Sequence, residues 1–366
     1  MIREGLARVA AGQDLTEVEM MQVMEEITEG RATPTQIGAF LFGLRIKGES
    51  VDEIVGTTKV VRSKSAPVPI GTSDVCLDRD EINVDQETLA ETSASGLEST
   101  RTFNVSTTTA FVVAGAGLRV AKHGYRYASS RWGSADVLEA LGLPLDLTPG
   151  QVRDCLDQVG IGFLYSNPLD GFMGHIFEPR REIGLRTIFN HVGPLVNPAG
   201  APVQVLGVYK ERFTEILAKA LVKLGCRNGL VFCGQDTYDE LSITGNSRVT
   251  RLRDGDIETY SMAPEDVGLK RAKPEEIVGG NAEQNAAITR AILEGEKGAR
   301  RDIVLLNAAA VLEAVGKAET MAEGIAVAAA SIDSGRSLEK LDKLVALGQY
   351  KAVPPVTPSG WGWGSR

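Results

Sequence analysis

The chain has 366 residues, 40 of them glycine, with 43% hydrophobic and only 5% aromatic residues, a composition typical of an α/β protein large enough for two domains. The formal net charge of −9 argues against nucleic acid or an anionic membrane as a general partner. No apolar run reaches the ~18 residues of a membrane span. The four cysteines form no CxxC pair and the three histidines are scattered, so we expect a cytoplasmic protein with reduced thiols and no histidine-rich metal centre.

The first 66 residues predict a small lobe made only of helices, because apolar residues recur at three- and four-residue spacing. Thr16 and Glu19 match a capping box at the start of the second helix. Further helices are expected over 36–46 and 51–63. The Leu/Phe-rich face of the 36–46 helix would pack on a second lobe or on a second copy of the chain.

Beyond residue 67, short β-rich runs alternate with helical patterns, and this alternation predicts a largely parallel sheet covered by helices. Strands are expected at 105–113, 117–121, 162–165, 203–208, 229–233 and 247–252. Helices are expected at 135–141, 149–159, 211–224, 281–293, 302–315 and 322–334. We therefore expect an α/β lobe over 67–350, followed by a Pro/Gly/Ser-rich flexible tail over 351–366.

The stretch around residue 105 carries the features of an anion site. Asn104, Ser106 and Thr107 stand where a strand would pass into a helix, and Lys122 follows the next apolar segment. Hydroxyl and backbone N–H groups at such a junction can surround phosphate oxygens, while a lysine adds a point charge. For any single residue of this set, a helix cap or a solvated turn is the simpler interpretation. The residues in combination favour phosphate binding.

Two adjacent carboxylates form a second candidate feature. Asp239 and Glu240 follow the apolar run 229–233, so they are expected at the carboxyl end of the sheet, where open α/β folds bind ligands. Mg²⁺ commonly bridges such carboxylates and substrate phosphates. An isolated Asp-Glu pair is usually a solvated turn, but a phosphate site in the same chain favours a magnesium site.

Three arginines form the third candidate feature. Arg180, Arg181 and Arg186 are expected to precede a helix that a Gly/Pro/Asn loop ends. Salt bridges on a helix surface are the simpler interpretation for Arg181 and Arg186. Arg180 is the better candidate for binding an anionic group, since it lies at the start of the segment.

Taken together, these segments resemble the anthranilate phosphoribosyltransferase family over nearly the whole chain. The matching runs are Gln36-Ile-Gly-Ala-Phe-Leu, Thr102-Phe-Asn-Val-Ser-Thr, Lys122-His-Gly, Gly133-Ser-Ala-Asp-Val-Leu-Glu-Ala-Leu-Gly, Arg186-Thr-Ile-Phe-Asn, Asp239-Glu-Leu-Ser, and Gly279-Gly-Asn with Asn285-Ala. The resemblance implies the α/β fold of class IV phosphoribosyltransferases and nucleoside phosphorylases, with a small N-terminal α-helical lobe and a larger lobe around a mostly parallel central sheet. It also implies a homodimer through the helical lobe, with residues 168–195 packing back on that lobe.

The implied reaction moves ribose 5-phosphate from phosphoribosyl pyrophosphate (PRPP) to an aromatic amine such as anthranilate, a step of tryptophan biosynthesis, with Mg²⁺ assisting diphosphate departure. No residue is implied as a general acid or base. The implied donor-binding residues are Asn104, Ser106, Thr107, Lys122 and Gly124, with Ser95 and Gly96 near the place of the family's glycine loop. The implied acceptor-binding residues are Arg180, Tyr125, Gly193 and Pro194, and the implied metal-binding residues are Ser106, Asp239 and Glu240.

The chain departs from the family's pattern in its diphosphate loop. The run Gly-Thr-Gly-Gly-Asp-Gly that should stand shortly before Thr102 is absent. An acidic stretch over 78–87 with five carboxylates stands there, followed by Thr92-Ser-Ala-Ser-Gly-Leu. We expect this stretch to be mobile and Lys122 to line a phosphate-sized pocket.

The acceptor side also departs from the pattern. Tyr125 stands where the family has an asparagine that contacts the acceptor, and Trp132 stands where a small residue is usual. Asp170-Gly-Phe-Met-Gly-His replaces the family's His-Pro-Ala-Met segment. These departures leave open a homologue with a different donor or acceptor, or a non-catalytic nucleotide-binding or regulatory paralogue. A nucleoside phosphorylase relative is less consistent with the helical-lobe and Asp-Glu-Leu-Ser matches.

Overall fold

The structure is a computed structural model that describes residues 1–64, 75–79, 102–125, 133–166, 173–196, 203–236 and 239–351. The predictions made for Ser95, Gly96, Trp132, the acidic stretch beyond residue 79, the 170–172 part of the replaced segment and the tail beyond residue 351 lie outside these residues.

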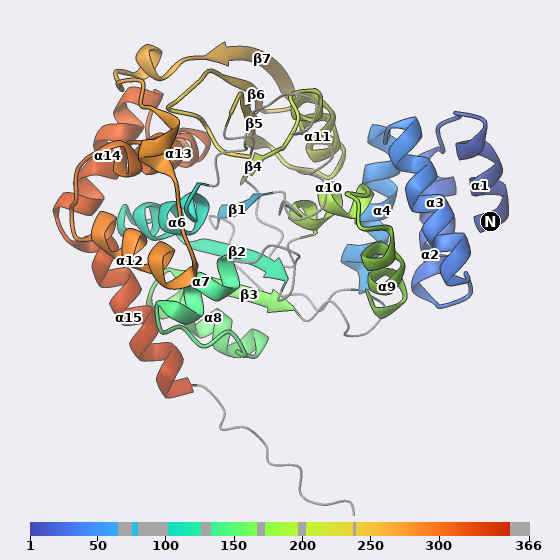
Figure 1. The fold of residues 1–366 in the computed structure, drawn as a ribbon, viewed down its shortest axis with the longest axis horizontal. Helices are drawn as coiled ribbons and strands as arrows, with labels where there is room; N and C mark the ends of the chain where they lie inside the picture. Colours follow the sequence, from blue (N-terminus) through green and yellow to red (C-terminus); the bar gives the residue numbers. More distant parts are fainter. Residues whose placement is uncertain are drawn as a thin grey trace, which may run out of the picture.

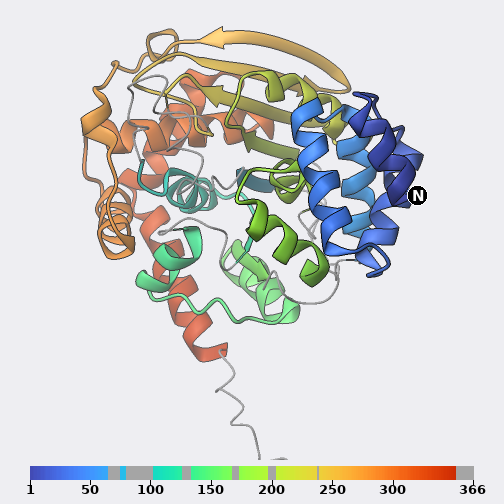
Figure 2. The same ribbon diagram turned by 45° about the vertical axis from the view of Figure 1, so that its right-hand side comes forward.

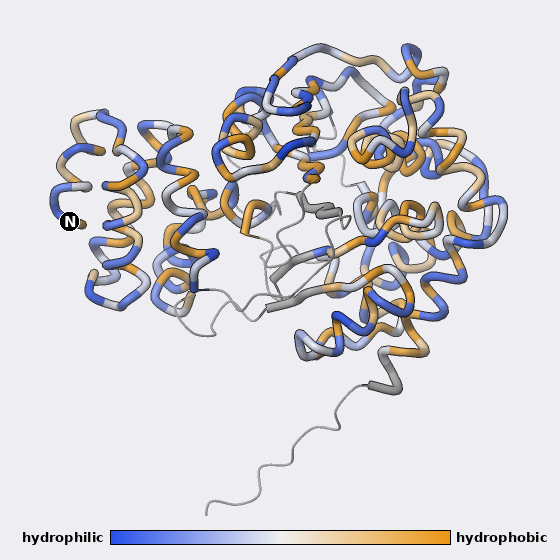
Figure 3. Tube along the Cα trace, turned by 180° about the vertical axis from the view of Figure 1, so that it is seen from behind, coloured by the Kyte–Doolittle hydropathy of each residue, from blue (hydrophilic) through white to orange (hydrophobic). Residues whose placement is uncertain are grey.

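Four helices form the N-terminal lobe, shown at one side of the molecule in Figure 1: α1 (Ile2–Ala10), α2 (Glu17–Thr28), α3 (Pro34–Lys47) and α4 (Val51–Lys64). Thr16 caps α2, because its hydroxyl accepts from the Glu19 N–H while the Glu19 carboxylate accepts from the Thr16 N–H at 2.8 Å. Hydrophobic and hydrophilic residues mix along each of these helices (Figure 3), as expected for helices with one buried face. The helical lobe predicted from the residue spacing is therefore confirmed.

The larger lobe is built on a seven-stranded sheet with the order β3-β2-β1-β4-β5-β6-β7. Its strands are β1 (Val75–Arg79), β2 (Val120–Tyr125), β3 (Ile161–Ser166), β4 (Val203–Gly207), β5 (Asn228–Gly234), β6 (Ser247–Arg253) and β7 (Asp256–Met262). The pairs from β3 to β5 are parallel, whereas β5–β6 and β6–β7 are antiparallel. The mostly parallel sheet predicted from the sequence is confirmed, although β1 and β7 were missed.

The helices of this lobe are α6 (Val105–Gly115), α7 (Ser134–Ala140), α8 (Pro149–Gln158), α9 (Gly174–Ile183), α10 (Ile188–Leu195), α11 (Arg212–Lys223), α12 (Ala282–Leu293), α13 (Ala299–Ala314), α14 (Met321–Asp333) and α15 (Arg336–Lys351). Two short 3-10 turns, η2 (Pro264–Val267) and η3 (Pro274–Ile277), lie between β7 and α12. Figure 1 shows α6 between the strands β1 and β2 and the helices α12 to α15.

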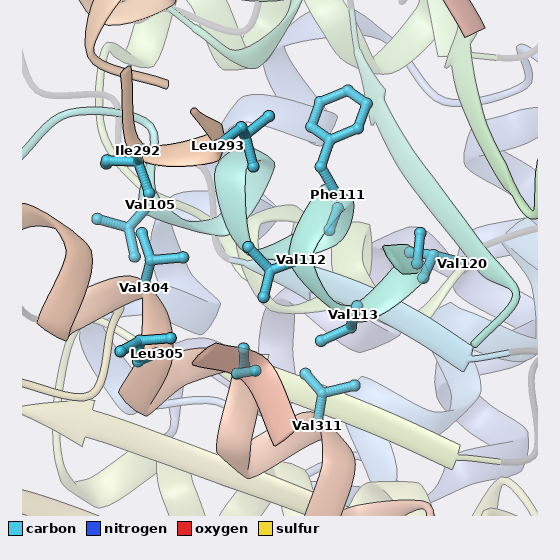
Figure 4. Packing of buried hydrophobic residues seen from close by; sticks show 14 of the residues in the cluster. Val105, Phe111, Val112, Val113, Val120, Ile292, Leu293, Val304, Leu305 and Val311 are labelled. Atoms are coloured by element: carbon cyan, nitrogen blue, oxygen red, sulfur yellow. The ribbon is translucent and has the colours of Figure 1, made fainter. Parts of the chain in front are cut away.

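The segment predicted as a strand over 105–113 is a helix, so that prediction was wrong. Its valines and threonines favour a strand locally. In the structure the segment is enclosed between the sheet and α13, α14 and α15, so a helix that is apolar on every side is the stable solution. Figure 4 shows Val112 and Val113 of α6 on the side of Val304 and Val311 of α13, while the Phe111 ring lies on the other side of α6. The next strand, β2, starts three residues later than the predicted 117–121 strand.

Both faces of the central strands are buried. Along β4 and β5, Val205 and Leu230 belong to the core that contains α6 and α13. Leu206 and Val231, one residue further on, belong to the core that contains α11 and the helical lobe. Because successive side chains of a strand point to opposite faces, the sheet lies between two hydrophobic layers.

Three helices of the α/β lobe pack against the helical lobe (Figure 2). The contacts join α9 to α2 and α3, α10 to α3 and α4, and α11 to α4. Arg45 Nη1 donates to the Arg186 carbonyl at 2.9 Å, and Arg62 Nε donates to the Leu195 carbonyl at 2.8 Å. The lobes are therefore joined by a shared apolar core and by arginine–carbonyl hydrogen bonds. In the part of the chain described, no helix combines the length and apolar character needed to cross a bilayer.

Candidate active site

The candidate site lies where the strand order of the sheet reverses. From β1 the chain continues to β2 and β3 on one side, whereas β4 and β5 lie on the other side. Open α/β sheets bind ligands beyond the carboxyl ends of the strands at such a switch point. The switch point here is between β1 and β4, next to the two loops that carry the predicted donor and metal residues.

The start of α6 brings several predicted donor residues together. Asn104 precedes the helix and no side chain caps its first turn. The Val105 N–H donates to the Phe103 carbonyl at 2.7 Å, so the N–H groups of Ser106 and Thr107 are the ones left for a ligand. Thr107 is fully buried, and its hydroxyl has no hydrogen-bond partner within the described residues. Lys122 of β2 is also buried, and its Nζ lies 3.4 Å from the Ser106 Oγ. A cation, hydroxyls and N–H groups thus converge at one helix N-terminus, as anion binding requires.

Asn104 is held by a segment far away in the sequence. Asn285 Nδ2 donates to Asn104 Oδ1 at 3.0 Å, and Asn285 Oδ1 accepts from the Gly280 N–H at 2.7 Å. A methyl group on Gly279 would lie 2.7 Å from the Phe103 Cα and 2.8 Å from Asn285 Oδ1, so only glycine fits there. Asn285 was missed as a site residue by sequence reasoning, although its run was among the family matches.

Asp239 and Glu240 lie beyond the end of β5 and are 7% and 1% exposed. The carbonyl of Asp239 is packed on Gly207 at the end of β4, where an added methyl group would be 1.7 Å from it. On the other side, the Asn307 side chain of α13 accepts from the Leu241 N–H at 3.0 Å and donates to the Leu241 carbonyl at 3.1 Å. This turn is therefore fixed between β4 and α13.

A neighbouring aspartate stabilises the same loop. Asp236 accepts hydrogen bonds from the Ser242 hydroxyl at 2.6 Å and from the Thr244 hydroxyl. Ser242 Oγ in turn accepts from the Thr244 and Gly245 N–H groups at 3.0 and 2.9 Å. Asp236 therefore has a structural role that the sequence did not indicate.

The donor set at this turn suits Mg²⁺. The described residues contain no group of three or more His, Cys, Asp or Glu side chains that could hold a metal by themselves. Mg²⁺ is usually bound by one or two carboxylates, and waters and substrate phosphates complete its coordination. Asp239 and Glu240 match that requirement.

The arginines differ from the prediction in their placement. Arg180 and Arg181 lie inside α9 rather than before a helix, and only Arg186 precedes the next helix, α10. Arg181 forms an ion pair with Glu178 at 2.7 Å, which agrees with the simpler interpretation. Arg186 instead lies with its guanidinium carbon 3.8 Å from the centre of the Tyr209 ring.

Arg180 is oriented by α10. Its Nη2 donates to Asn190 Oδ1 at 3.3 Å, and its guanidinium carbon lies 5.4 Å from the centre of the Phe189 ring. Asn190 Oδ1 also accepts from the Thr187 N–H at 2.9 Å. Arg180 therefore joins α9 to α10, two helices that both contact the helical lobe.

The remaining predicted acceptor residues, together with the predicted donor residue Gly124, lie on two elements. Gly193 and Pro194 are inside α10, not in a loop after it, so the predicted Gly/Pro loop was wrong at these positions. Gly124 and Tyr125 are the last two residues of β2 and pair with Tyr165 and Ser166 of β3. Their backbone therefore ends at the carboxyl edge of the sheet.

His191 was not predicted to matter, but it is a buried polar group between the lobes. Its ring stacks 5.7 Å from Tyr209 and lies 3.9 Å from Phe213, measured between ring centres. Its Nδ1 has no hydrogen-bond partner within the described part of the chain. Burial, together with Arg186, Arg212 and Arg45, lowers the pKa of His191 to about 3, so the ring is neutral in the folded protein.

Comparison with known proteins identifies the family. Residues 3–65 match the helical bundle domain of the glycosyl transferase family, and residues 86–338 match its a/b domain. The anthranilate phosphoribosyltransferases of Citrifermentans bemidjiense and Geobacter sulfurreducens are 52% and 50% identical over 347 residues, covering 95% of this chain and 99% of each relative.

Solved structures of similar fold agree with these relatives. The anthranilate phosphoribosyltransferase of Thermus thermophilus has a TM-score of 0.83 and 35% identity, covering 94% of this chain and 99% of that one. The Saccharomyces cerevisiae enzyme in complex with PRPP and Mg has a TM-score of 0.81 and 23% identity, covering 95% and 98% of the two chains, and supports the fold alone. Because relatives of high identity align along both lobes, the chain belongs to the anthranilate phosphoribosyltransferase family of glycosyltransferases.

Proposed function

We propose that this enzyme transfers ribose 5-phosphate from PRPP to anthranilate with the help of Mg²⁺, a step of tryptophan biosynthesis. The proposal rests on two groups of residues that lie at the same switch point of the sheet. Lys122 and Ser106 meet at the start of α6, and Asp239 and Glu240 lie in a buried turn against the end of β4. The first feature suits an anion and the second suits its metal.

In the proposed reaction, the protein positions the substrates and stabilises charge, and it does not use a strong acid or base. Lys122, Ser106, Thr107 and the first N–H groups of α6 bind the phosphorylated donor. Mg²⁺ held by Asp239 and Glu240 would neutralise charge on the departing diphosphate. Fixed dipoles and cations that match the charge of the transition state lower the barrier without reorganising during the reaction.

Arg180 is the proposed contact for the acceptor carboxylate. Asn190 and the Phe189 ring hold the guanidinium in place from α10. A planar guanidinium suits a carboxylate, because it can donate two parallel hydrogen bonds. The Gly193–Pro194 segment and Tyr125 are proposed as neighbours of the same acceptor.

The helical lobe is the proposed homodimer contact, with its boundary near residue 66. Phe42 and Ile46 of α3 are 46% and 71% exposed and lie one helical turn apart. Exposed apolar side chains that adjoin on one helix favour a second copy as their partner. The free thiols of Cys155, Cys226 and Cys233 are consistent with the reducing cytoplasm.

Calorimetric titration of PRPP with and without Mg²⁺ tests the donor half of this proposal. The wild type should bind PRPP with Mg²⁺, and Lys122→Ala should lose at least tenfold in affinity, because a charge-assisted contact contributes about 1.5–3 kcal/mol. Lys343→Ala, which removes an exposed lysine of α15, is the matched control and should bind like the wild type. No binding by the wild type at millimolar PRPP would reject the donor.

Turnover tests the acceptor half. Incubation with PRPP, Mg²⁺ and anthranilate should consume both substrates and release diphosphate. Donor binding without anthranilate consumption would mean that another acceptor occupies the Arg180 side of the site.

A further inference from the structure

We propose that Asn285 of α12 is a positioning residue that decides which end of the Asn104 amide faces the phosphorylated donor. The inference rests on the proposed function, because it assumes that Asn104 contacts that donor. It goes beyond that function by assigning a role to a residue on a separate helix, 181 positions away in the sequence.

The orientation of both amides follows from one backbone group. The Gly280 N–H can only donate, so the atom of Asn285 that lies 2.7 Å from it must be the carbonyl oxygen. The amide nitrogen of Asn285 therefore faces Asn104. Since that nitrogen also can only donate, the atom of Asn104 that lies 3.0 Å away must be its oxygen. The Gly280 N–H therefore fixes the orientation of both side-chain amides, and we call these two hydrogen bonds the relay.

The Asn104 amide nitrogen is consequently directed away from Asn285. Within the described residues it donates to no protein acceptor. A phosphorylated sugar presents oxygen acceptors, so an NH₂ group attracts it where a carbonyl oxygen would repel it. The relay therefore orients the Asn104 NH₂ group as a hydrogen-bond donor before any ligand binds.

The segment that begins the relay is fixed by contacts of its own. Val278 and Thr102 form an isolated antiparallel β-bridge. Atoms of Asn285 and Phe103 lie so close to Gly279 that no side chain fits there. Asn285 is 4% exposed and Asn104 is 3% exposed, so bulk water competes little for these hydrogen bonds. A flip of the Asn285 amide would set donor against donor at one end and acceptor against acceptor at the other, which is costly in a buried site.

The same two helices supply a matched control. One turn further along, Thr289 of α12 and Thr108 of α6 share a hydrogen bond of 2.9 Å, and both residues are fully buried. This bond also joins residues 181 positions apart. Thr289→Val removes it without altering the shape of the side chain. The Thr108 hydroxyl also donates to the Asn104 backbone carbonyl at 3.1 Å, so this control perturbs the same helix pair while leaving the bond between the Asn104 and Asn285 amides intact.

The experiment is a double-mutant cycle of Asn104→Ala and Asn285→Ala, with Thr289→Val beside it. PRPP affinity is measured by calorimetry, the KM for PRPP and kcat by turnover, and stability by thermal unfolding. We expect Asn285→Ala to weaken PRPP binding about tenfold in the wild-type background. In the Asn104→Ala background, Asn285→Ala should weaken binding less than twofold, because the Asn104 amide that it orients is no longer present. Thr289→Val should lower the unfolding temperature while PRPP affinity and KM stay within twofold of the wild type.

Three results would overturn the positioning role: equal losses from Asn285→Ala in both backgrounds, a loss in stability with unchanged PRPP affinity, or the same affinity loss from Thr289→Val. If Asn285→Ala does not fold, Asn285→Asp takes its place. Asn285→Asp can still accept from Gly280 but forces the Asn104 amide to turn. If Asn285→Asp weakens PRPP binding only where Asn104 is present, the relay is supported. An equal loss of affinity in the Asn104→Ala background would reflect only the added charge and would reject the relay. A wild type that binds no PRPP rejects the proposed function instead, so the two failures are distinguishable.

Discussion

His191 is one side chain that makes the stability of the fold depend on pH. Its pKa falls from the usual 6.5 to about 3 on burial, so between these values the unfolded chain binds the extra proton. Stability from this group is complete above pH 6.5 and is lost as the pH falls towards 3. Between pH 7 and pH 5 we expect the free energy of unfolding to decrease by about 2 kcal/mol from this group.

Urea unfolding of the wild type and of His191→Phe at pH 7 and pH 5 measures that contribution. Phenylalanine keeps the contacts with Tyr209 and Phe213 but cannot bind a proton, so His191→Phe should lose less stability at pH 5 than the wild type. Burial raises the pKa of Glu49, but this residue is present in both proteins and its effect cancels. Equal losses in the two proteins would show that His191 is accessible to protons in the folded state.

At the residue scale, the sequence predicts the parts of the site that are close in the chain. Ser106 and Lys122 lie on consecutive elements, so the hydroxyl-rich turn and the lysine indicate an anion site before the structure is known. Asn285 and Asn307 act on partners 181 and 66 residues away. A buried asparagine on a predicted helix gives no indication of which distant backbone it will contact, so these two roles required the structure.

At the scale of elements, the fit between the end of β4 and the Asp239 turn should control metal binding. Gly207→Ala places a methyl group where the Asp239 carbonyl lies, and backbone atoms on both sides must move. We expect Mg²⁺-dependent PRPP binding to weaken at least tenfold in calorimetric titration, because metal ligands tolerate little displacement.

Gly150→Ala on α8 is the control for that substitution. A methyl group there meets no atom within 4 Å, so binding and stability should match the wild type. Unchanged magnesium dependence in Gly207→Ala would mean that the Asp239 turn moves freely and does not position the metal.

Elements were predicted well where their ends carry chemical signals. The capping box predicted at Thr16 starts α2, and the structure has a second one at Thr33 that starts α3. The helix α6 was mistaken for a strand because enclosure on every side removes the polar face that would reveal its period. The strand β7 was missed, although Asp254 and Gly255 have positive φ angles of 49° and 93° and match a two-residue hairpin turn. That signal was present in the sequence.

At the scale of the whole molecule, alternating strands and helices after a purely helical segment were enough to predict two lobes and a mostly parallel sheet. They could not predict how the lobes meet. The shared core joins α3 and α4 to α9 and α10, and it depends on packing between residues more than a hundred positions apart. The domain boundary near residue 66 stays a prediction.

The assembly prediction follows from what this packing leaves exposed. The buried face of α3 serves the shared core, while Phe42 and Ile46 remain exposed on the helix. If they meet a second copy, light scattering of the wild type should give twice the chain mass, and Ile46→Glu should give the monomer mass. An exposed position tolerates glutamate, so the unfolding temperature of the separated chain should change only through lost association. Val18→Glu changes a side chain on α2 that is 63% exposed and should leave the mass unchanged. A wild-type monomer, or an Ile46→Glu dimer, would place the assembly surface elsewhere.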